Sequence, residues 1–171
     1  QWRRHFLDSA QLWSLLPPPP PDRPRVLADL GSGAGFPGLV LAILGAGAVH
    51  LIESDHRKAT FLRETARETG TDVTVHDRRI VEVPVFPADV VTARAFAPLP
   101  QVLAAAAPFL RPATASGPSG VGLFPKGRSL QRELTDSLGK WKMQFDLHPS
   151  RTDPTAQILR LTDLTEGNRQ P

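Results

Sequence analysis

The sequence predicts an α/β fold: a doubly wound, mostly parallel seven-stranded sheet with an antiparallel C-terminal strand and an N-terminal helical extension. Three observations predict it. Short apolar runs alternate with amphipathic segments from Arg25 onward, the connections between them are short, and a glycine-rich loop follows the first run. Alternating β and α units favour a parallel sheet covered by helices on both faces. Right-handed crossovers then give the doubly wound arrangement.

Residues 1–24 are predicted to form a helix and a linker. Within 3–16, Phe6 and Trp13 are spaced as on one helical face. Residues 17–21 are five consecutive prolines. Proline lacks the amide donor that a helix needs, so the helix must end there and a stiff polyproline spacer follows.

The main domain is predicted over 25–164, followed by a polar tail at 165–171. Each expected strand is a short apolar run bounded by glycine, proline or polar residues, and each expected helix repeats apolar residues every three or four positions. Gly70 suits the end of the second of these helices. The expected order is strand 26–30, helix 37–44, strand 49–53, helix 56–69, strands 72–76 and 88–93, helix 99–110, strand 121–126, helix 129–138, and strands 141–148 and 156–164, the last two paired antiparallel.

Composition narrows the possible functions. The 171 residues fit one domain, and the absence of cysteine excludes a disulfide scaffold, Cys-ligated zinc or iron–sulfur sites and a thiolate nucleophile. A net charge of +3 does not by itself indicate a nucleic-acid binder. No stretch approaches the roughly 18 apolar residues of a membrane span, and no start resembles a signal peptide. The chain opens at Gln1 and its only methionine is Met143, so we expect part of a longer, cytoplasmic protein.

The strongest motif is the loop over residues 29–38, DLGSGAGFPG. It fits two templates, the dinucleotide-binding G-x-G-x-x-G and the D-x-G-x-G-x-G loop of enzymes that use S-adenosylmethionine (SAM). In doubly wound sheets, ligands bind beyond the carboxyl ends of the strands. The loop, Glu53, the Asp77 region and Arg94 are therefore expected around one crevice.

Electrostatics favours SAM. A pyrophosphate binds best at a helix N-terminus that has no negative charge beside it, and the Asp29 carboxylate would face that anion. The ammonium and sulfonium of SAM are cations, which a carboxylate suits. Glu53 ends the second predicted strand, where a carboxylate can accept both ribose hydroxyls. A nicotinamide or flavin cofactor and a purely structural glycine turn remain the alternatives.

The residues that the sequence lacks limit which atoms can accept the methyl group. Covalent methylation of pyrimidine C5 needs a cysteine, and methylation of an amino nitrogen commonly uses an Asn/Asp-Pro-Pro-aromatic loop after the fourth strand. That position reads TARAFAP over 92–98, without a carboxylate or an amide. An acceptor with a free lone pair remains, and guanine N7 is such an atom. Positioning would then do most of the catalysis, without a general base.

A series of motifs occurs in order along the chain: RHFLDS at 4–9, the glycine loop, LIES at 51–54 followed by Lys58 and FLRE at 61–64, VTARA at 91–95 and PKG at 125–127. From about Arg4 to Leu164, the chain resembles the bacterial glucose-inhibited division protein B family. Members of this family are SAM-dependent methyltransferases that modify N7 of guanine 527 in 16S rRNA.

The resemblance implies a class I SAM-dependent methyltransferase fold, with S-adenosylhomocysteine as the second product. It implies 16S rRNA in the small ribosomal subunit as partner; we also expect a monomer without a metal or a membrane contact. It implies that the methionine and ribose are lined by Gly31, Gly33, Gly35 and Phe36, that Glu53 binds the ribose, that Arg78, Arg79 and Ile80 border the adenine, and that Arg94 lies beside the transfer site, as the catalytic residue and a cofactor contact.

Substrate RNA is expected to be held through phosphates on a rim. The candidates at and around this rim are His5, Asp8, Arg94, Lys126 and Arg128, with Arg3 and Arg4. Four of these residues also have a purely structural interpretation. Arg94 is then an ion-pair partner that holds the loop after the fourth strand. His5 and Asp8 pin the first helix, and Lys126 is a solvated strand end. The basic residues of helix 56–69 are expected to pair with Glu64 and Glu68.

Two alternatives to an rRNA methyltransferase stay open. One is a methyltransferase of a small molecule or a protein. The other is a SAM- or RNA-binding module without turnover.

Overall fold

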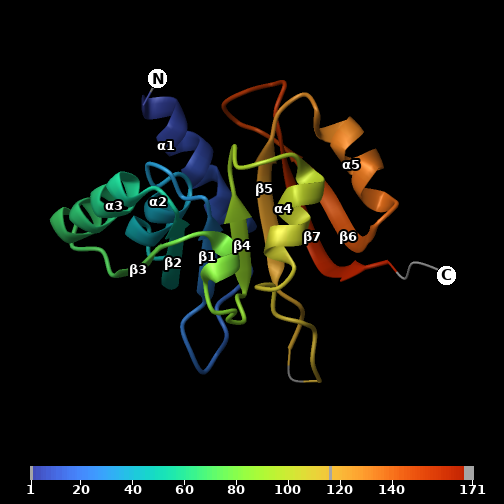
Figure 1. Ribbon diagram of the computed structural model, residues 1–171. Helices are drawn as coiled ribbons and strands as arrows, with labels where there is room; N and C mark the ends of the chain where they lie inside the picture. The colour runs from blue at the N-terminus through green and yellow to red at the C-terminus, as the bar shows by residue number, and fades with distance from the viewer. Residues whose placement is uncertain (1, 116, 168–171) are drawn as a thin grey trace.

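The computed structural model describes residues 2–115 and 117–167, and it contains one seven-stranded sheet in the order β3-β2-β1-β4-β5-β7-β6 (Figure 1). β1 to β5 run parallel, and β7 runs antiparallel to both β5 and β6. The predicted mostly parallel sheet with an antiparallel C-terminal strand is therefore confirmed. The strands are β1 (Val26–Leu30), β2 (Ala48–Glu53), β3 (Val73–Asp77), β4 (Val90–Ala93), β5 (Val121–Lys126), β6 (Trp141–Pro149) and β7 (Gln157–Glu166).

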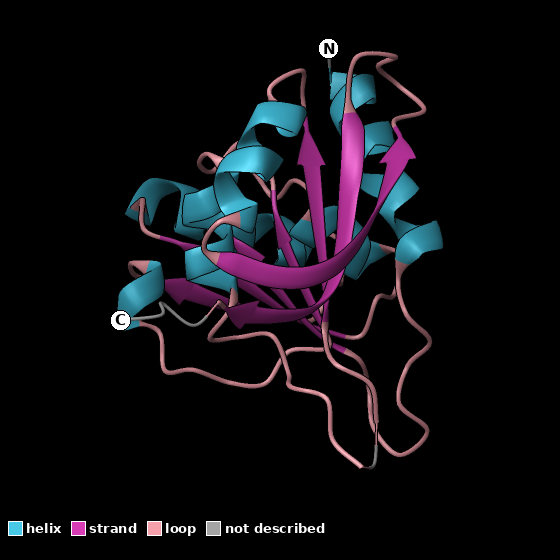
Figure 2. Cartoon of the chain, turned by 90° about the vertical axis from the view of Figure 1, so that its right-hand side faces the viewer, coloured by secondary structure: helices cyan, strands magenta, loops and turns pink. Residues whose placement is uncertain are grey.

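Helices cover both faces of the sheet, as the side view shows (Figure 2). They are α1 (Trp2–Ala10), η1 (Gln11–Leu15), α2 (Gly38–Ile43), α3 (His56–Glu68), η2 (Ile80–Glu82), α4 (Leu99–Ala106) and α5 (Leu130–Leu138), where η marks a 3-10 helix. None of the helices in these two described ranges is long and apolar enough to cross a membrane.

The core is divided by the sheet into two apolar clusters. Successive residues of a strand point to opposite faces. Leu27 accordingly packs with η1, α2 and α3, whereas Ala28 packs with α4 and α5. The alternation ties each of these helices to one face. Parallel pairing of β1 with β2 and with β4 brings the carboxyl ends of the three strands together.

The N-terminal segment is not one continuous helix. The helix predicted over 3–16 ends at Ala10 and continues as the tighter 3-10 turn η1. This turn places Leu12, which is fully buried, in the cluster that contains Leu27. The proline run then folds back, because the Arg25 guanidinium donates hydrogen bonds to the carbonyls of Pro17 and Ala46.

Several element boundaries differ from the prediction. The helix predicted over 99–110 ends at Ala106, and the strand predicted over 88–93 begins at Val90. β7 continues to Glu166, into the predicted polar tail, because its last residues still pair with β6. The short helix η2 was not predicted. Gln1 and residues 168–171 lie outside the described residues. The proline loop and the described residues 111–115 and 117–120 lie at the end of the sheet opposite α1 (Figure 1).

Candidate functional site

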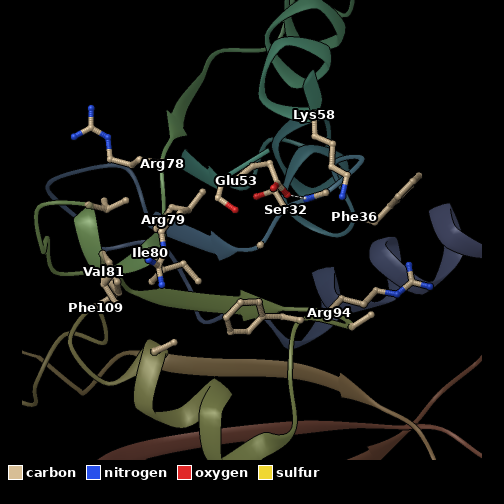
Figure 3. A pocket seen from close by; sticks show the side chains of 18 of the residues that line it. Ser32, Phe36, Glu53, Lys58, Arg78, Arg79, Ile80, Val81, Arg94 and Phe109 are labelled. Atoms are coloured by element: carbon tan, nitrogen blue, oxygen red, sulfur yellow. Dashed lines mark hydrogen bonds between the residues drawn. The ribbon is translucent and has the colours of Figure 1, made fainter. Parts of the chain in front are cut away.

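A cavity of about 960 Å³ opens where β1, β2 and β4 end. Seven segments line it: α1, the glycine loop, the end of β2, the start of α3, residues 78–85, the loop after β4, and the end of α4 with its following turn. Figure 3 shows the Glu53 carboxylate between two ends of this cavity. Arg79, Ile80 and Phe109 lie at one end, and Phe36 and Arg94 lie at the other.

The glycine loop turns through left-handed backbone conformations. Gly31, Gly33 and Gly35 have φ angles of 68°, 56° and 92°, which residues with a Cβ rarely adopt. A Cβ on Gly31 would also lie 2.9 Å from Cδ2 of Phe96. Only glycine lets the backbone pass this close to Phe96.

The buried Asp29 carboxylate holds the end of the glycine loop to β4 through hydrogen bonds. Its carboxylate is fully buried and accepts hydrogen bonds from Thr92 Oγ1 at 2.7 Å and from the Gly38 amide at 3.1 Å. Burial raises the pKa of Asp29 to about 6, against hydrogen bonds from Thr92, Ser32 and Gly38 that lower it. Asp29 does not line the cavity, so its carboxylate does not contact the space where a ligand would lie.

Glu53 links the loop to α3. One carboxylate oxygen accepts from the Gly33 amide at 2.8 Å, and the other accepts from the Asp55 amide at 2.8 Å. The residue is 8% exposed and lines the cavity. Because each carboxylate oxygen can accept two hydrogen bonds, Glu53 retains acceptor capacity toward a ligand hydroxyl.

The end of the cavity beyond Glu53 is an apolar slot. Ile80, Val81, Val83 and Phe109 line it, which suits the faces of a flat heterocycle. Sequence reasoning missed Val81, Val83 and Phe109. The signal for the two valines was the apolar run IVEVPVF, which lies outside every predicted element.

Arg94 occupies the other end and is held by α1. Its Nη2 donates to Asp8 Oδ2 at 2.9 Å and to His5 Nδ1 at 2.8 Å. Thr152 donates to the second Asp8 oxygen, from the loop between β6 and β7. The sequence motif around His5 and Asp8 and the arginine after β4 therefore meet at one point.

Aromatic side chains close the same end. Phe36 lies 5.6 Å from His5 and 5.2 Å from Phe6, centroid to centroid, and Trp2 lies 6.2 Å from Phe36. Trp2 is 66% exposed and lines the cavity. This end of the cavity therefore presents aromatic side chains beside Arg94.

Lys126 is turned inward. Its Nζ donates to the Ala97 carbonyl at 2.8 Å and to Glu133 Oε2 at 2.8 Å, and its side chain is 11% exposed. Glu133 also accepts from the Leu99 amide at 2.6 Å. Sequence reasoning missed Glu133, whose partner lies seven residues earlier on another element.

A smaller hollow of about 330 Å³ adjoins the cavity at Arg94 and Ala95, and we call it the side pocket. Its lining residues are Arg4, Asp8, Gln11, Arg94, Ala95, Pro125, Lys126, Gly127, Ser129, Glu133, Ser150, Asp153, Ala156, Gln157 and Ile158.

The structure thus divides the sequence-predicted residues into three groups. The main cavity is lined by His5, Gly31, Gly33, Phe36, Glu53, Arg78, Arg79, Ile80 and Arg94. The side pocket is lined by Arg4, Asp8 and Lys126, together with Arg94. Neither is lined by Asp29, Gly35 or Arg128, and Arg128 is exposed on the turn before α5.

The basic face of α3 does not form the predicted ion pairs. In the described residues, no ion pair joins its basic side chains to Glu64 or Glu68. Arg63 instead reaches Asp77 on β3 at 3.4 Å. Lys58 lines the main cavity. The prediction considered one helix alone, whereas β3 brings a carboxylate closer.

Comparison with known proteins gives a consistent picture. The family model GidB, described as rRNA small subunit methyltransferase G, matches residues 1–150. Ribosomal RNA small subunit methyltransferase G of Rhodospirillum rubrum is 56% identical over 163 residues, which cover 95% of this chain and 76% of that protein.

Solved methyltransferases share the fold. One is a putative S-adenosyl-L-methionine-dependent methyltransferase from Methanococcus maripaludis, with a TM-score of 0.68, 9% identity and coverage of 99% of this chain and 89% of that one. Another is magnesium protoporphyrin IX methyltransferase from Synechocystis with bound SAM, with a TM-score of 0.60, 13% identity and coverage of 94% and 79%.

Proposed function

The chain belongs to the GidB family of rRNA small subunit methyltransferases, and from this premise we propose that it transfers a methyl group from SAM to N7 of a guanine in 16S rRNA. The observation that carries the proposal is the cavity at the carboxyl ends of the strands. The glycine loop and the Glu53 carboxylate, which is proposed to bind the ribose, line this cavity. Aromatic side chains and Arg94 line its other end. Under this proposal, the donor and acceptor sites lie at the two ends of one cavity.

The residues present fit SAM. The apolar slot suits adenine, Glu53 suits the ribose hydroxyls, and the backbone of Gly31 and Gly33 is open to the methionine moiety. A volume of about 960 Å³ lies at the large end for ligand pockets and leaves room for a base beside the cofactor. When bound, SAM supplies an electrophilic methyl group on a sulfonium.

Arg94, held in place by Asp8, is proposed to orient the guanine. N7 carries a lone pair and no proton, so the side chains need only align it with the methyl group. Arg94 has N–H groups beyond Nη2 that can donate to O6, the acceptor next to N7. The paired Asp8 offsets the guanidinium charge, which would otherwise oppose the positive charge that develops on the ring.

The substrate RNA is proposed to reach the site as part of the small ribosomal subunit, in the bacterial cytoplasm. Arg3 and Arg128 are exposed and are proposed to contact phosphates, whereas Arg4 is paired with Asp153. Binding through phosphates weakens with salt. The affinity for RNA should therefore fall as salt rises, while the affinity for SAM changes little.

Methyl transfer from isotopically labelled SAM tests the proposal with three acceptors: small ribosomal subunits, naked 16S rRNA, and a panel of small molecules and proteins. We expect label in the rRNA. Label only in a small molecule or protein would assign a different methyltransferase. SAM binding without transfer to any acceptor would assign a binding module.

A further inference from the structure

The side pocket is lined by both apolar and polar residues. Ala95, Pro125, Ala156 and Ile158 contribute apolar surface. Side chains from α1, α5 and the β6–β7 loop contribute donors and acceptors around it. A volume of about 330 Å³ is at the small end for ligand pockets. The hollow therefore suits one small group that has both apolar and polar surface.

The charges around the side pocket balance. Arg4 pairs with Asp153, Arg94 pairs with Asp8 at 2.9 Å, and Lys126 pairs with Glu133 at 2.8 Å. Each cation thus has its own carboxylate partner in the wall. A phosphate placed here would face three carboxylates, so the charge pattern favours a neutral ligand over an anion.

The position of the side pocket selects the ligand. It shares Arg94 and Ala95 with the main cavity, so the two hollows lie on either side of the residue that is proposed to orient the target guanine. Single-stranded RNA is commonly recognised with its bases splayed into separate pockets. An RNA strand with its target guanine in the main cavity carries the next nucleotide past Arg94.

We propose that the side pocket receives the base of a nucleotide adjacent to the target guanine, as a neutral heterocycle of unpaired RNA. The inference rests on the proposed function, and it adds a subsite that reads the sequence or the unpaired state around the target. Arg94 then stands between two bases, one that is methylated and one that only anchors the strand.

Gly127→Trp tests the subsite. Gly127 lines the side pocket, its φ is not left-handed, and a Cβ built on it meets no atom within 4 Å. Gly139 at the other end of α5 is also open to a Cβ and lines neither hollow, so Gly139→Trp is the matched control. Should Gly127→Trp fail to fold, Gln157→Trp, at an exposed lining residue, serves in its place.

Gly127→Trp should raise the KM for small ribosomal subunits roughly tenfold, which matches the loss of one base contact. The Kd for SAM should stay unchanged, and Gly139→Trp should behave as the unsubstituted protein does. Equal KM values for the two tryptophan variants would overturn the proposal.

A second experiment combines the protein variant with a change in the RNA, as in a double-mutant cycle. Small subunits are reconstituted with one abasic nucleotide, placed either just before or just after the target guanine. One abasic position should raise the KM of the unsubstituted protein and leave Gly127→Trp unaffected. An equal penalty in both proteins would show that the hollow holds backbone rather than a base, and would refute the subsite. No transfer by the unsubstituted protein to intact subunits would instead refute the proposed function, and the subsite with it.

Discussion

Two acidic residues at the glycine loop have different environments. Glu53 lines the cavity and retains acceptor capacity, whereas Asp29 is sealed beneath the loop with both oxygens hydrogen bonded. Sequence spacing places both near a cationic cofactor, but it does not show that only one can touch the cofactor. Each side chain therefore has its own expected effect on SAM binding.

Glu53→Gln should weaken SAM binding by roughly 10- to 100-fold, because hydrogen bonds to a charged group contribute about 1.5–3 kcal/mol. The amide also places a donor where two backbone N–H groups already donate. Calorimetric titration with SAM measures the loss. The matched control is Glu64→Gln on the exposed face of α3, which should bind normally; equal affinities for both variants would contradict the role given to Glu53.

SAM affinity should rise with pH because of Asp29. Burial raises the pKa of this carboxyl to about 6, so it is mostly neutral at pH 5 and mostly ionised at pH 7. A bound cation favours the ionised form, so the Kd should fall several-fold as pH rises through 6. Calorimetry from pH 5 to 7 checks this. Asp29→Asn should flatten the profile, and an unchanged slope in that variant would assign the effect to another group.

At the scale of elements, the loop after β4 is held at both ends. Arg94 is tied to α1 through Asp8, while the Ala97 carbonyl and the Leu99 amide are tied to Lys126 and Glu133. Ala95 between them has a φ of 50°, a conformation that costs energy in a residue other than glycine. The neighbouring elements must therefore impose the geometry that presents Arg94 and Phe96 to the cavity.

Lys126→Met should destabilise the fold by about 3 kcal/mol, because it leaves the largely buried Glu133 without its cation. The double variant Lys126→Met/Glu133→Leu should recover much of this loss. Urea denaturation measures both. If Lys126→Met keeps full stability and instead weakens RNA binding, Lys126 is the phosphate contact that its sequence position predicts.

The same pair predicts acid sensitivity. Burial would raise the pKa of Glu133, but hydrogen bonds from Lys126, Ser129 and the Leu99 amide outweigh burial and lower it. Its contribution to stability is therefore present above the unfolded pKa and is lost as pH falls through the lower folded pKa. The double variant should lose less stability than the unsubstituted protein below about pH 4.5; an equal loss would exclude Glu133 as the source.

For the whole molecule, the sequence predicted what depends on local pattern. Apolar runs, helical spacing and Gly70 placed nearly every element, and alternation of strands and helices predicted the sheet type. The sequence did not predict that β7 inserts between β5 and β6, because strand order depends on contacts between distant segments. The turn η1 also followed from burial of Leu12 rather than from periodicity.

The candidate site also contains features that the sequence predicts and contacts that it does not. The glycine loop and Glu53 were found because one short segment and one strand end carry them. The link between Arg94 and Asp8, the inward turn of Lys126 and the side pocket arise from residues far apart in the chain. No local pattern encodes such contacts, and only the folded sheet brings them together.

We propose that this cavity delivers a methyl group to N7 of one guanine. N7-methylguanine is the modification to locate, so the direct measurement is to react small ribosomal subunits with the protein and SAM and then map chain cleavage after borohydride and aniline treatment, which acts at N7-methylated guanine. We expect cleavage at a single guanine of 16S rRNA, and this cleavage should disappear when SAM is omitted. Incorporated methyl label without any cleavage site would contradict it.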